Sequence, residues 1–430
     1  MTAYEAAAFA LNELKKAGGD LYSARARVSE KREFTADSGR FSLLRTTFDK
    51  GLDLTLIKDH KRGKVAGNDL SEAAITKAAR DCLLSAQGAS ADPAWQLYEG
   101  AQRSFTQGAP QADQDRLFAR AQELLDSIAR DYPKVMVEQM IVSHDRVESY
   151  YQNSLGASYQ TEAGDYGVFI MISAHEGDKT SSFNYTGFAT DNLDSPFIDQ
   201  ADLRQTLSDI QRQIDTVAPE GKYEGCVVFT PGCAASILED LAGNFVGDGV
   251  ILDGTSLWKD KLNQQVADPR LSLRIAPHDP AVVCGENYLD DGRLSEDYDL
   301  IKDGVLKQFM LSSFVANKTG HQPAPSGSFS LIVAPGEDSL EDIISGIDKG
   351  LLVSRFSGGS PASNGDFSGI AKNSFLIEKG RVTQAVSETM ISGNLAQMVQ
   401  KLRGISRQRV QDGQRVLPWI AVEGITISGK

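Results

Sequence analysis

The sequence predicts an α+β fold in two domains: an N-terminal α+β domain over residues 1–220 and a C-terminal β-rich domain over residues 221–430. A chain of 430 residues is long enough for two or three domains with sizeable cores. Helical and strand-like patterns follow one another in the first half, whereas strands and glycine-rich loops dominate the second. The polar segment "APEGKYEG", residues 218–225, precedes an apolar run and is the predicted boundary.

The chain begins with a helix and a strand meander. Ala7, Leu11 and Leu14 form one stripe of a helix over residues 3–17, which the following pair of glycines ends. Apolar residues then alternate with polar ones from residue 21 to residue 58. Turn residues near 37–39 and at 50–51 divide this region into the strands of a meander.

Further helices and strands complete the predicted N-terminal domain. Apolar residues recur at helical spacing in three segments, and β-like runs occur in three others. The helices are expected after a Ser71 cap, around residues 117–128 and over 202–217, and the strands at 134–142, 146–152 and 167–174. Helices that follow strands in this way are expected to cover a sheet.

One helix of the second half has a clear apolar face. It follows the strand "CVVFT" and a Pro-Gly turn, and it starts near Cys233. Its apolar residues are spaced to pack on a sheet: Ala234, Ile237, Leu238, Leu241 and Phe245. Two glycine-rich segments, residues 323–330 and 357–369, lie further on, and neither has the spacing of a phosphate-binding loop. They are interpreted as turns between strands.

Composition excludes several classes of partner. Lys and Arg number 44 and Asp and Glu 58, so the net charge of −14 opposes binding to a nucleic acid backbone. The N-terminal segment lacks the pattern of a signal peptide, and no apolar run reaches the roughly 20 residues that span a membrane. We therefore expect a cytoplasmic protein. The four cysteines contain no C-x-x-C pair and are expected to be reduced.

Several segments resemble a known family. "VVFTPGCAASILEDLAGNFVGDGV", "GDFSGIAKNSFLIEKGRVTQAVSETMISGNL" and the closing "LPWIAVEGITISGK" are similar to the TldD/PmbA family, also called TldD/TldE. The resemblance extends over most of the chain and implies the two-domain architecture and a dimer that encloses a cavity. An older label of this family, modulator of DNA gyrase, carries no implication of DNA contact for so acidic a chain.

The resemblance also shows where this chain departs from the TldD type. In that type a helix bears H-E-x-x-x-H, a cysteine near the C-terminus completes a zinc site, and the glutamate acts as general base. Here Glu239, Asp240 and Asn244 occupy the three motif positions, and the last cysteine is Cys284, well before the C-terminal segment 407–419. The chain therefore resembles the PmbA/TldE type, and no catalytic, cofactor or metal residue is carried over.

This resemblance implies a non-catalytic subunit that pairs with a TldD-like zinc metallopeptidase acting on peptides or unfolded proteins. Two alternatives remain open. In the first, the chain is a homodimeric peptide-binding protein without a catalytic partner. In the second, the chain is an independent hydrolase with Mg²⁺ or Ca²⁺ on the carboxylates at 239–240. His278 and Cys284, six residues apart, are interpreted as a surface histidine and a buried thiol and not as a catalytic pair. Separately, the aromatic pair Tyr150-Tyr151 and the strand-rich second half suggest peptide binding at a sheet edge, which suits a subunit that holds substrate while another chain cuts.

Overall fold

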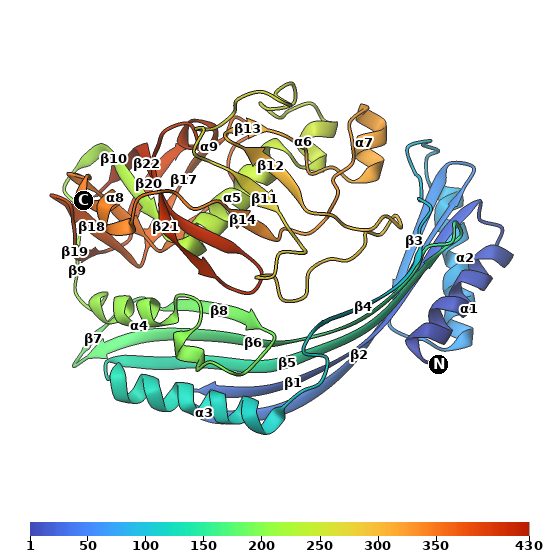
Figure 1. Cartoon of the computed structure of the whole chain (residues 1–430), viewed down its shortest axis with the longest axis horizontal. Helices are drawn as coiled ribbons and strands as arrows, with labels where there is room; N and C mark the ends of the chain where they lie inside the picture. Colours follow the sequence, from blue (N-terminus) through green and yellow to red (C-terminus); the bar gives the residue numbers. More distant parts are fainter. Residues whose placement is uncertain (430) are drawn as a thin grey trace.

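The computed structural model describes residues 1–429 and contains two β-sheets (Figure 1). A long, curved sheet from the first half of the chain lies below a second, β-rich body from the second half. Helices and strands are both abundant, and the predicted α+β class is confirmed. None of the helices within residues 1–429 is both long and apolar enough to cross a membrane.

The first sheet is eight-stranded, and its main strand order is β3-β2-β1-β5-β6-β4. Strands β4 and β8 follow one another along β6, β4 in parallel and β8 antiparallel. The strands are β1 (Leu21–Asp37), β2 (Arg40–Lys58), β3 (Lys61–Gly67), β4 (Gln102–Gly108), β5 (Val135–Asn153), β6 (Ser158–Glu176), β7 (Lys179–Thr180) and β8 (Asn184–Thr190).

Helices cover the two ends of this curved sheet. Their bounds are α1 (Ala3–Lys16), α2 (Glu72–Gly88), α3 (Gln114–Asp131), η1 (Phe197–Asp199) and α4 (Leu203–Arg212). Thr2 and Glu5 form a capping box at the start of α1, and the Ser71 side chain caps α2 as predicted. Helices α1 and α2 share one apolar core with β1 to β3, whereas α3 and α4 share another with β5 and β6.

The second sheet begins with β9 and has 14 strands, of which β10, β15 and β22 are central. Strand β10 pairs in parallel with β15 and antiparallel with β22. The strands are β9 (Thr216–Val217), β10 (Lys222–Phe229), β11 (Leu273–Ile275), β12 (Tyr298–Lys302), β13 (Val305–Leu306), β14 (Leu331–Val333), β15 (Lys349–Val353), β16 (Arg355–Gly358), β17 (Asp366–Lys372), β18 (Ser374–Glu378), β19 (Arg381–Val386), β20 (Thr389–Asn394), β21 (Leu402–Gln411) and β22 (Val416–Ser428).

Five helices accompany this sheet, and the longest of them carries the candidate site. Their bounds are α5 (Pro231–Phe245), α6 (Asp248–Leu252), α7 (Ser313–Thr319), α8 (Leu340–Ser345) and α9 (Leu395–Met398). Helix α5 directly follows β10, and its apolar side chains join the largest core of the molecule. This connection fixes α5 against the central strands.

Several predicted boundaries are wrong. Strand β2 runs through residues 50–51 without a turn, and β5 is one strand where two were predicted. Helix α4 ends at Arg212, five residues early, and Thr216 and Val217 pair with β19 instead. The domain boundary between residues 220 and 221 stays a prediction.

The second half packs onto the first sheet through a short loop that follows Cys284. The Tyr159 hydroxyl donates to the Gly292 carbonyl at 2.8 Å, and the Tyr151 hydroxyl donates to the Asp290 carbonyl at 3.1 Å. The Asp290 carboxylate also pairs with Arg25 at 2.8 Å. Because Tyr151 is 2% exposed, it belongs to this internal contact. It is therefore not available for the peptide binding predicted from Tyr150-Tyr151.

Candidate functional site

The candidate site is built on α5, which the local sequence specifies well. Thr230 is extended and Pro231 occupies the first helical turn, where its missing N–H costs nothing. The predicted apolar face is confirmed, since Ile237, Leu238 and Leu241 are all buried. The three motif positions lie off this face, where Glu239 is exposed and Asp240 and Asn244 are half-buried.

Glu239 is bound by an arginine from the C-terminal segment. Nη1 of Arg415 donates to Oε1 of Glu239 at 2.8 Å. The same guanidinium donates through Nε to Oδ2 of Asp412 at 3.1 Å, and the Arg415 backbone N–H donates to Oδ1 of Asp412 at 2.7 Å. Arg415 thus stands between two carboxylates and joins the segment 407–419 to α5.

The other two motif positions have different surroundings. Nδ2 of Asn244 donates to the Ala362 carbonyl at 2.9 Å, which ties α5 to the glycine-rich loop 357–369. Asp240 is half-buried, and this loss of water raises the pKa of its carboxyl. The structure therefore brings together the helix, the loop and the C-terminal segment that carry the family resemblance.

These residues do not fit the zinc site that the resemblance implies for the TldD type. Zinc sites use imidazole, thiolate and carboxylate ligands, and the three positions supply no imidazole or thiolate. Glu239 is already held by Arg415, whose positive charge opposes binding of a metal cation to the same carboxylate. Across residues 1–429 no group of three or more His, Cys, Asp or Glu side chains is placed to hold a metal.

A cavity of about 440 Å³ lies beside this site, between the two sheets. Helix α4 and strand β8 form one wall, and the start of α5 together with β16 and β22 forms the other. Asp202, at the N-cap of α4, and Asp209, within α4, line it, and burial raises the pKa of both carboxyls. Arg355 and Arg415 line the opposite wall, so acidic and basic groups face the same space. Its volume is within the range of small-molecule sites, about 300–1,000 Å³.

His278 is exposed, as predicted, but Cys284 is an exposed residue as well, so the prediction of a buried thiol is wrong. The two side chains have different partners. The Nε2 atom of His278 lies 3.0 Å from the Ser295 carbonyl, whereas the Cys284 thiol donates to the Gly164 carbonyl at 3.5 Å. Loss of water around the thiol, with Asp165 nearby, raises the pKa of Cys284 to about 11. A neutral thiol is a poor nucleophile at pH 7.

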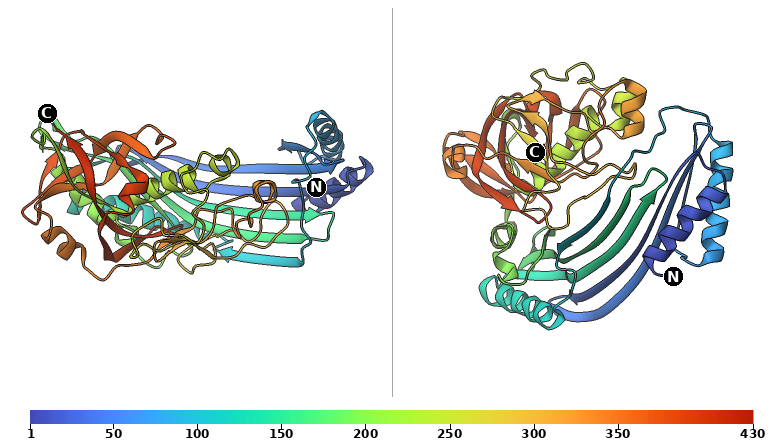
Figure 2. Two further views of the ribbon diagram at one scale, coloured as in Figure 1. Left: turned by 90° about the horizontal axis from the view of Figure 1, so that it is seen from above. Right: turned by 45° about the vertical axis from the view of Figure 1, so that its right-hand side comes forward.

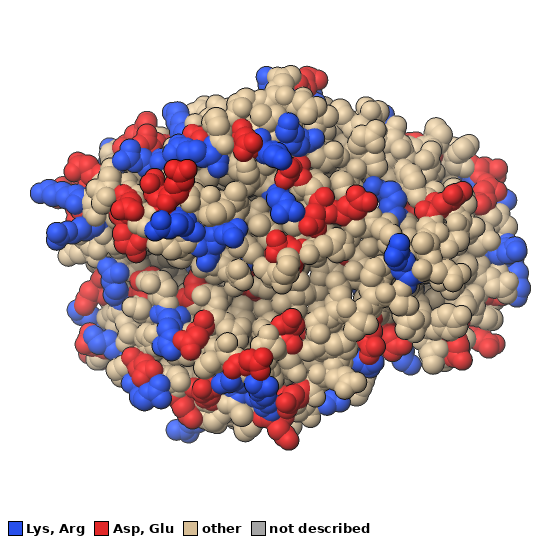
Figure 3. All heavy atoms as spheres, in the orientation of Figure 1, with Lys and Arg blue, Asp and Glu red and all other residues tan. Residues whose placement is uncertain are grey.

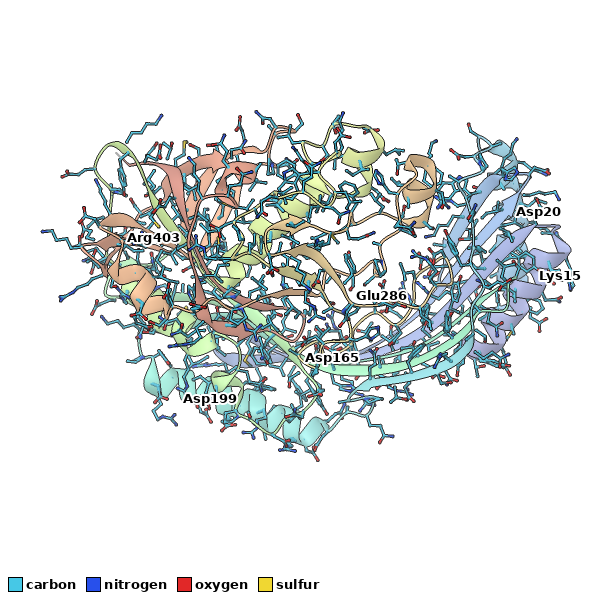
Figure 4. The ribbon with its side chains drawn as sticks, turned by 45° about the horizontal axis from the view of Figure 1, so that its top comes forward. Lys15, Asp20, Asp165, Asp199, Glu286 and Arg403 are labelled. Carbon is cyan, nitrogen blue, oxygen red and sulfur yellow. The ribbon has the colours of Figure 1, made fainter. Side chains whose placement is uncertain are left out.

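The glycine-rich segment 323–330 binds a carboxylate of the chain itself. The backbone N–H of Gly327 and the hydroxyl of Ser326 donate to Oε2 of Glu286 at 2.7 and 2.8 Å. In Figure 4, Glu286 is labelled on the second half of the chain and Asp165 on the first sheet below it. The segment is a structural loop, but it joins α7 to β14 and not two strands as predicted, and its anion-binding groups are occupied by Glu286.

The comparisons with known proteins agree with this architecture. Residues 220–429 match the PmbA/TldA metallopeptidase C-terminal domain. "Metalloprotease PmbA" of Escherichia coli O157:H7 is 27% identical over 416 residues, which cover 87% of this chain and 86% of the relative. The C-terminal half of the chain, residues 220–429, belongs to the PmbA/TldD family. This is a family of metallopeptidase-like proteins.

Two further relatives extend the comparison. The crystal structure of TldE from Thermococcus kodakarensis has a TM-score of 0.86 at 21% identity and covers 99% of this chain and 100% of its own. It shares the TldD/PmbA fold with the present chain. "Zinc metalloprotease TldD homolog" of Saccharolobus solfataricus is 24% identical over 275 residues, or 60% of each chain. Both the PmbA-type and the TldD-type names therefore occur among the relatives of this TldD/PmbA chain.

Sequence reasoning found Glu239, Asp240 and Asn244 but missed Arg415. The two partners of the ion pair are 176 residues apart, and no local pattern connects them. The cavity residues Asp202 and Asp209 were missed for the same reason. On the sequence they are ordinary polar positions of an amphipathic helix.

A double-mutant cycle measures the ion pair. We expect Glu239→Gln and Arg415→Met together to cost less than the sum of the single changes, with a coupling energy of about 0.5–1 kcal/mol. The expected coupling energy is small because water screens the pair: the Glu239 and Arg415 side chains are 47% and 28% exposed. Urea unfolding of the four proteins gives the coupling energy. A value within error of zero would show that the pair does not fix the C-terminal segment to α5.

Proposed function

We propose that this chain is the non-catalytic, PmbA/TldE-like subunit of a peptidase complex whose TldD-like subunit carries the zinc ion and cuts peptides or unfolded proteins. The observation that carries the proposal is the pairing of Glu239 with Arg415 at 2.8 Å, where the TldD-type motif has its first histidine. The histidine ligand expected at this position in the TldD type is replaced by the Glu239 carboxylate, which is already paired with the Arg415 guanidinium. Asn244, engaged with Ala362, replaces the second histidine.

The remaining features support the same proposal. On the face of the molecule in Figure 3, basic and acidic residues are interspersed, which supports a partner other than nucleic acid. All four cysteines are free, which suits the reducing cytoplasm that we propose for the complex. Residues of both sheets line the cavity beside α5, and we expect this cavity to help hold substrate near the partner.

The proposal predicts a metal-free, inactive chain that gains activity only with its partner. Elemental mass spectrometry of the desalted chain, with and without added Zn²⁺, Mg²⁺ or Ca²⁺, is expected to find far less than one metal per chain. Peptide cleavage by the isolated chain is expected to be absent. Co-expression with a TldD-like subunit from the same genome is expected to give zinc and cleavage together.

Variants decide between this function and an independent hydrolase. About one metal per chain, lost in Glu239→Ala or Asp240→Ala, together with cleavage by the isolated chain, would disprove the non-catalytic role. Asp178→Ala is the matched control, because it removes an exposed carboxylate in the turn between β6 and β7 of the first sheet. A TldD-like subunit that is fully active without this chain would also contradict the proposal.

A further inference from the structure

The cavity beside α5 is lined by two charged side chains that form no ion pair within residues 1–429. In the right-hand view of Figure 2, helix α4 of its first wall lies between the end of the curved sheet and the second half of the chain. The other charges of the lining are paired with neighbours: Arg415 with Glu239 and Asp412, and Asp209 with Arg212 at 3.6 Å. The two that are left are Arg355 and Asp202, one basic and one acidic.

The basic group, Arg355, begins β16 and is held by aromatic rings. Its guanidinium carbon lies 4.8 Å from the centre of the Phe183 ring and 5.2 Å from the centre of the Tyr185 ring. Contacts with aromatic rings position a guanidinium but do not neutralise its charge. Nη1 of Arg355 is buried and has no hydrogen-bond partner within residues 1–429. A planar donor group in this condition is suited to a carboxylate.

A buried acceptor lines the cavity close to this guanidinium. Asn373 directly follows Lys372, which pairs with Arg355 between β17 and β16. Its side chain is 6% exposed, and Nδ2 donates to the Phe183 carbonyl at 3.2 Å, but Oδ1 has no partner within residues 1–429. An unpaired buried acceptor is unfavourable, so the free energy of the site improves when a ligand N–H donates to it.

The acidic group, Asp202, lies at the wall that α4 forms. The Thr186 hydroxyl donates to Oδ1 of Asp202 at 3.1 Å, and burial raises the pKa of the carboxyl. An ammonium group would supply the positive charge that Asp202 lacks. Thr186 follows Tyr185 on β8, so both unpaired charges contact the same short stretch of one strand.

We propose that this cavity binds a free dipeptide with apolar side chains and recognises its two charged ends. The carboxylate binds Arg355, the ammonium binds Asp202, and the peptide N–H donates to Oδ1 of Asn373. Apolar residues of the lining, among them Leu352 and Leu417, receive the side chains of the dipeptide. The volume of about 440 Å³ is sufficient for a ligand of this size.

This specificity goes beyond the proposed function, since it concerns the isolated chain and needs no partner. The interior of a long peptide carries neither an ammonium nor a carboxylate at its backbone. The free ends therefore decide the binding, and a peptide with blocked ends is a poor ligand for this cavity.

Isothermal titration calorimetry of the full chain with leucyl-leucine tests the proposal. Leucyl-leucine is expected to bind. Its C-terminal amide and its N-acetyl form each lack one charge, and both are expected to bind about tenfold or more weakly. Chromatography of the dipeptide after the titration is expected to recover it intact, which separates binding from cleavage.

Two variants assign the two ends. Arg355→Met keeps an apolar side chain against the aromatic rings but removes the charge. Leucyl-leucine and its amide are then expected to bind within about twofold of each other, whereas the N-acetyl form stays weaker. Asp202→Asn is expected to do the reverse and to abolish the discrimination against the N-acetyl form. Arg130→Met on α3, at a side chain 69% exposed and outside the cavity lining, is the matched control.

Each of three results would overturn the inference. The first is no binding of leucyl-leucine by the wild-type chain at concentrations up to about 10 mM. The second is equal binding of the free and the blocked forms, a comparison that needs no variant. The third is an Arg355→Met variant that weakens leucyl-leucine and its amide by the same factor, which would show that Arg355 only supports the wall. A metal-free, inactive chain that binds no dipeptide would leave the proposed function standing, whereas cleavage of leucyl-leucine by the isolated chain would contradict that function.

Discussion

Replacing Gly63 with alanine is expected to destabilise the N-terminal core by about 3 kcal/mol or more. Gly63 lies on β3 directly beneath α2. A β-carbon there would stand 1.9 Å from the Cys82 carbonyl oxygen and 2.7 Å from the Ala86 backbone nitrogen. Both atoms belong to the helix backbone, so a side-chain rotation cannot relieve the clash, and α2 has to move away from the sheet.

Gly67, on the same strand, is the matched control. A β-carbon at Gly67 meets nothing within 4 Å, so Gly67→Ala is expected to change the free energy of unfolding by less than about 1 kcal/mol, in the stabilising direction if at all. Urea unfolding followed by circular dichroism compares the two variants. Equal stabilities would mean that α2 does not sit against β3 as closely as the Gly63 contact requires.

The fold class could be predicted because it depends on local patterns. Helix α5 is the clearest case: the spacing of its apolar residues identified both the helix and its buried face. The cap of α2 at Ser71 was also local, since the Ser71 side chain accepts from the Ala74 backbone N–H. In these segments propensity, capping and apolar spacing agree.

Predictions failed where distant parts of the chain decide the local structure. Gly51 was predicted to lie in a turn, but it lies within β2 and pairs with Arg27 of β1. Glycine leaves room there for the Arg27 side chain, because a β-carbon on residue 51 would stand 2.5 Å from Nε of Arg27. Helix α4 was predicted too long. The side-chain amide of Gln213 donates to the Ser374 carbonyl at 2.9 Å, and the residues after it join β19. Tertiary contacts overrode the helical pattern there.

The candidate site divides in the same way. Its three helix positions were predicted because the resemblance has a fixed local spacing, whereas Arg415 and the cavity depend on how the second sheet folds. Glu239 on the sequence alone is one of many surface acids. Its place in the site depends on the Arg415 guanidinium, which the turn before β22 brings to α5.

Replacing Phe245 with alanine is expected to cost about 3–5 kcal/mol, and the reason ties the stability of the core to the geometry of the site. Phe245 ends α5, is fully buried and stacks on Trp258 with 4.8 Å between ring centroids. Its truncation leaves a cavity beneath the residues that hold Asn244 against the loop 357–369. We expect this loop to become sensitive to limited proteolysis under conditions in which the wild-type loop is resistant.

Two variants separate packing from chemistry. Phe245→Leu keeps most of the buried volume, so its cost is expected to be smaller, about 1–2 kcal/mol, and the loop is expected to stay protected. Leu252→Ala on α6, at a side chain 40% exposed, is expected to stay within about 0.5 kcal/mol of the wild type. If Phe245→Ala were as stable as Leu252→Ala, α5 would not be anchored through this stack. The buried side chains of Ile237, Leu238 and Leu241 would then have to hold α5, and with it the motif positions, against the core.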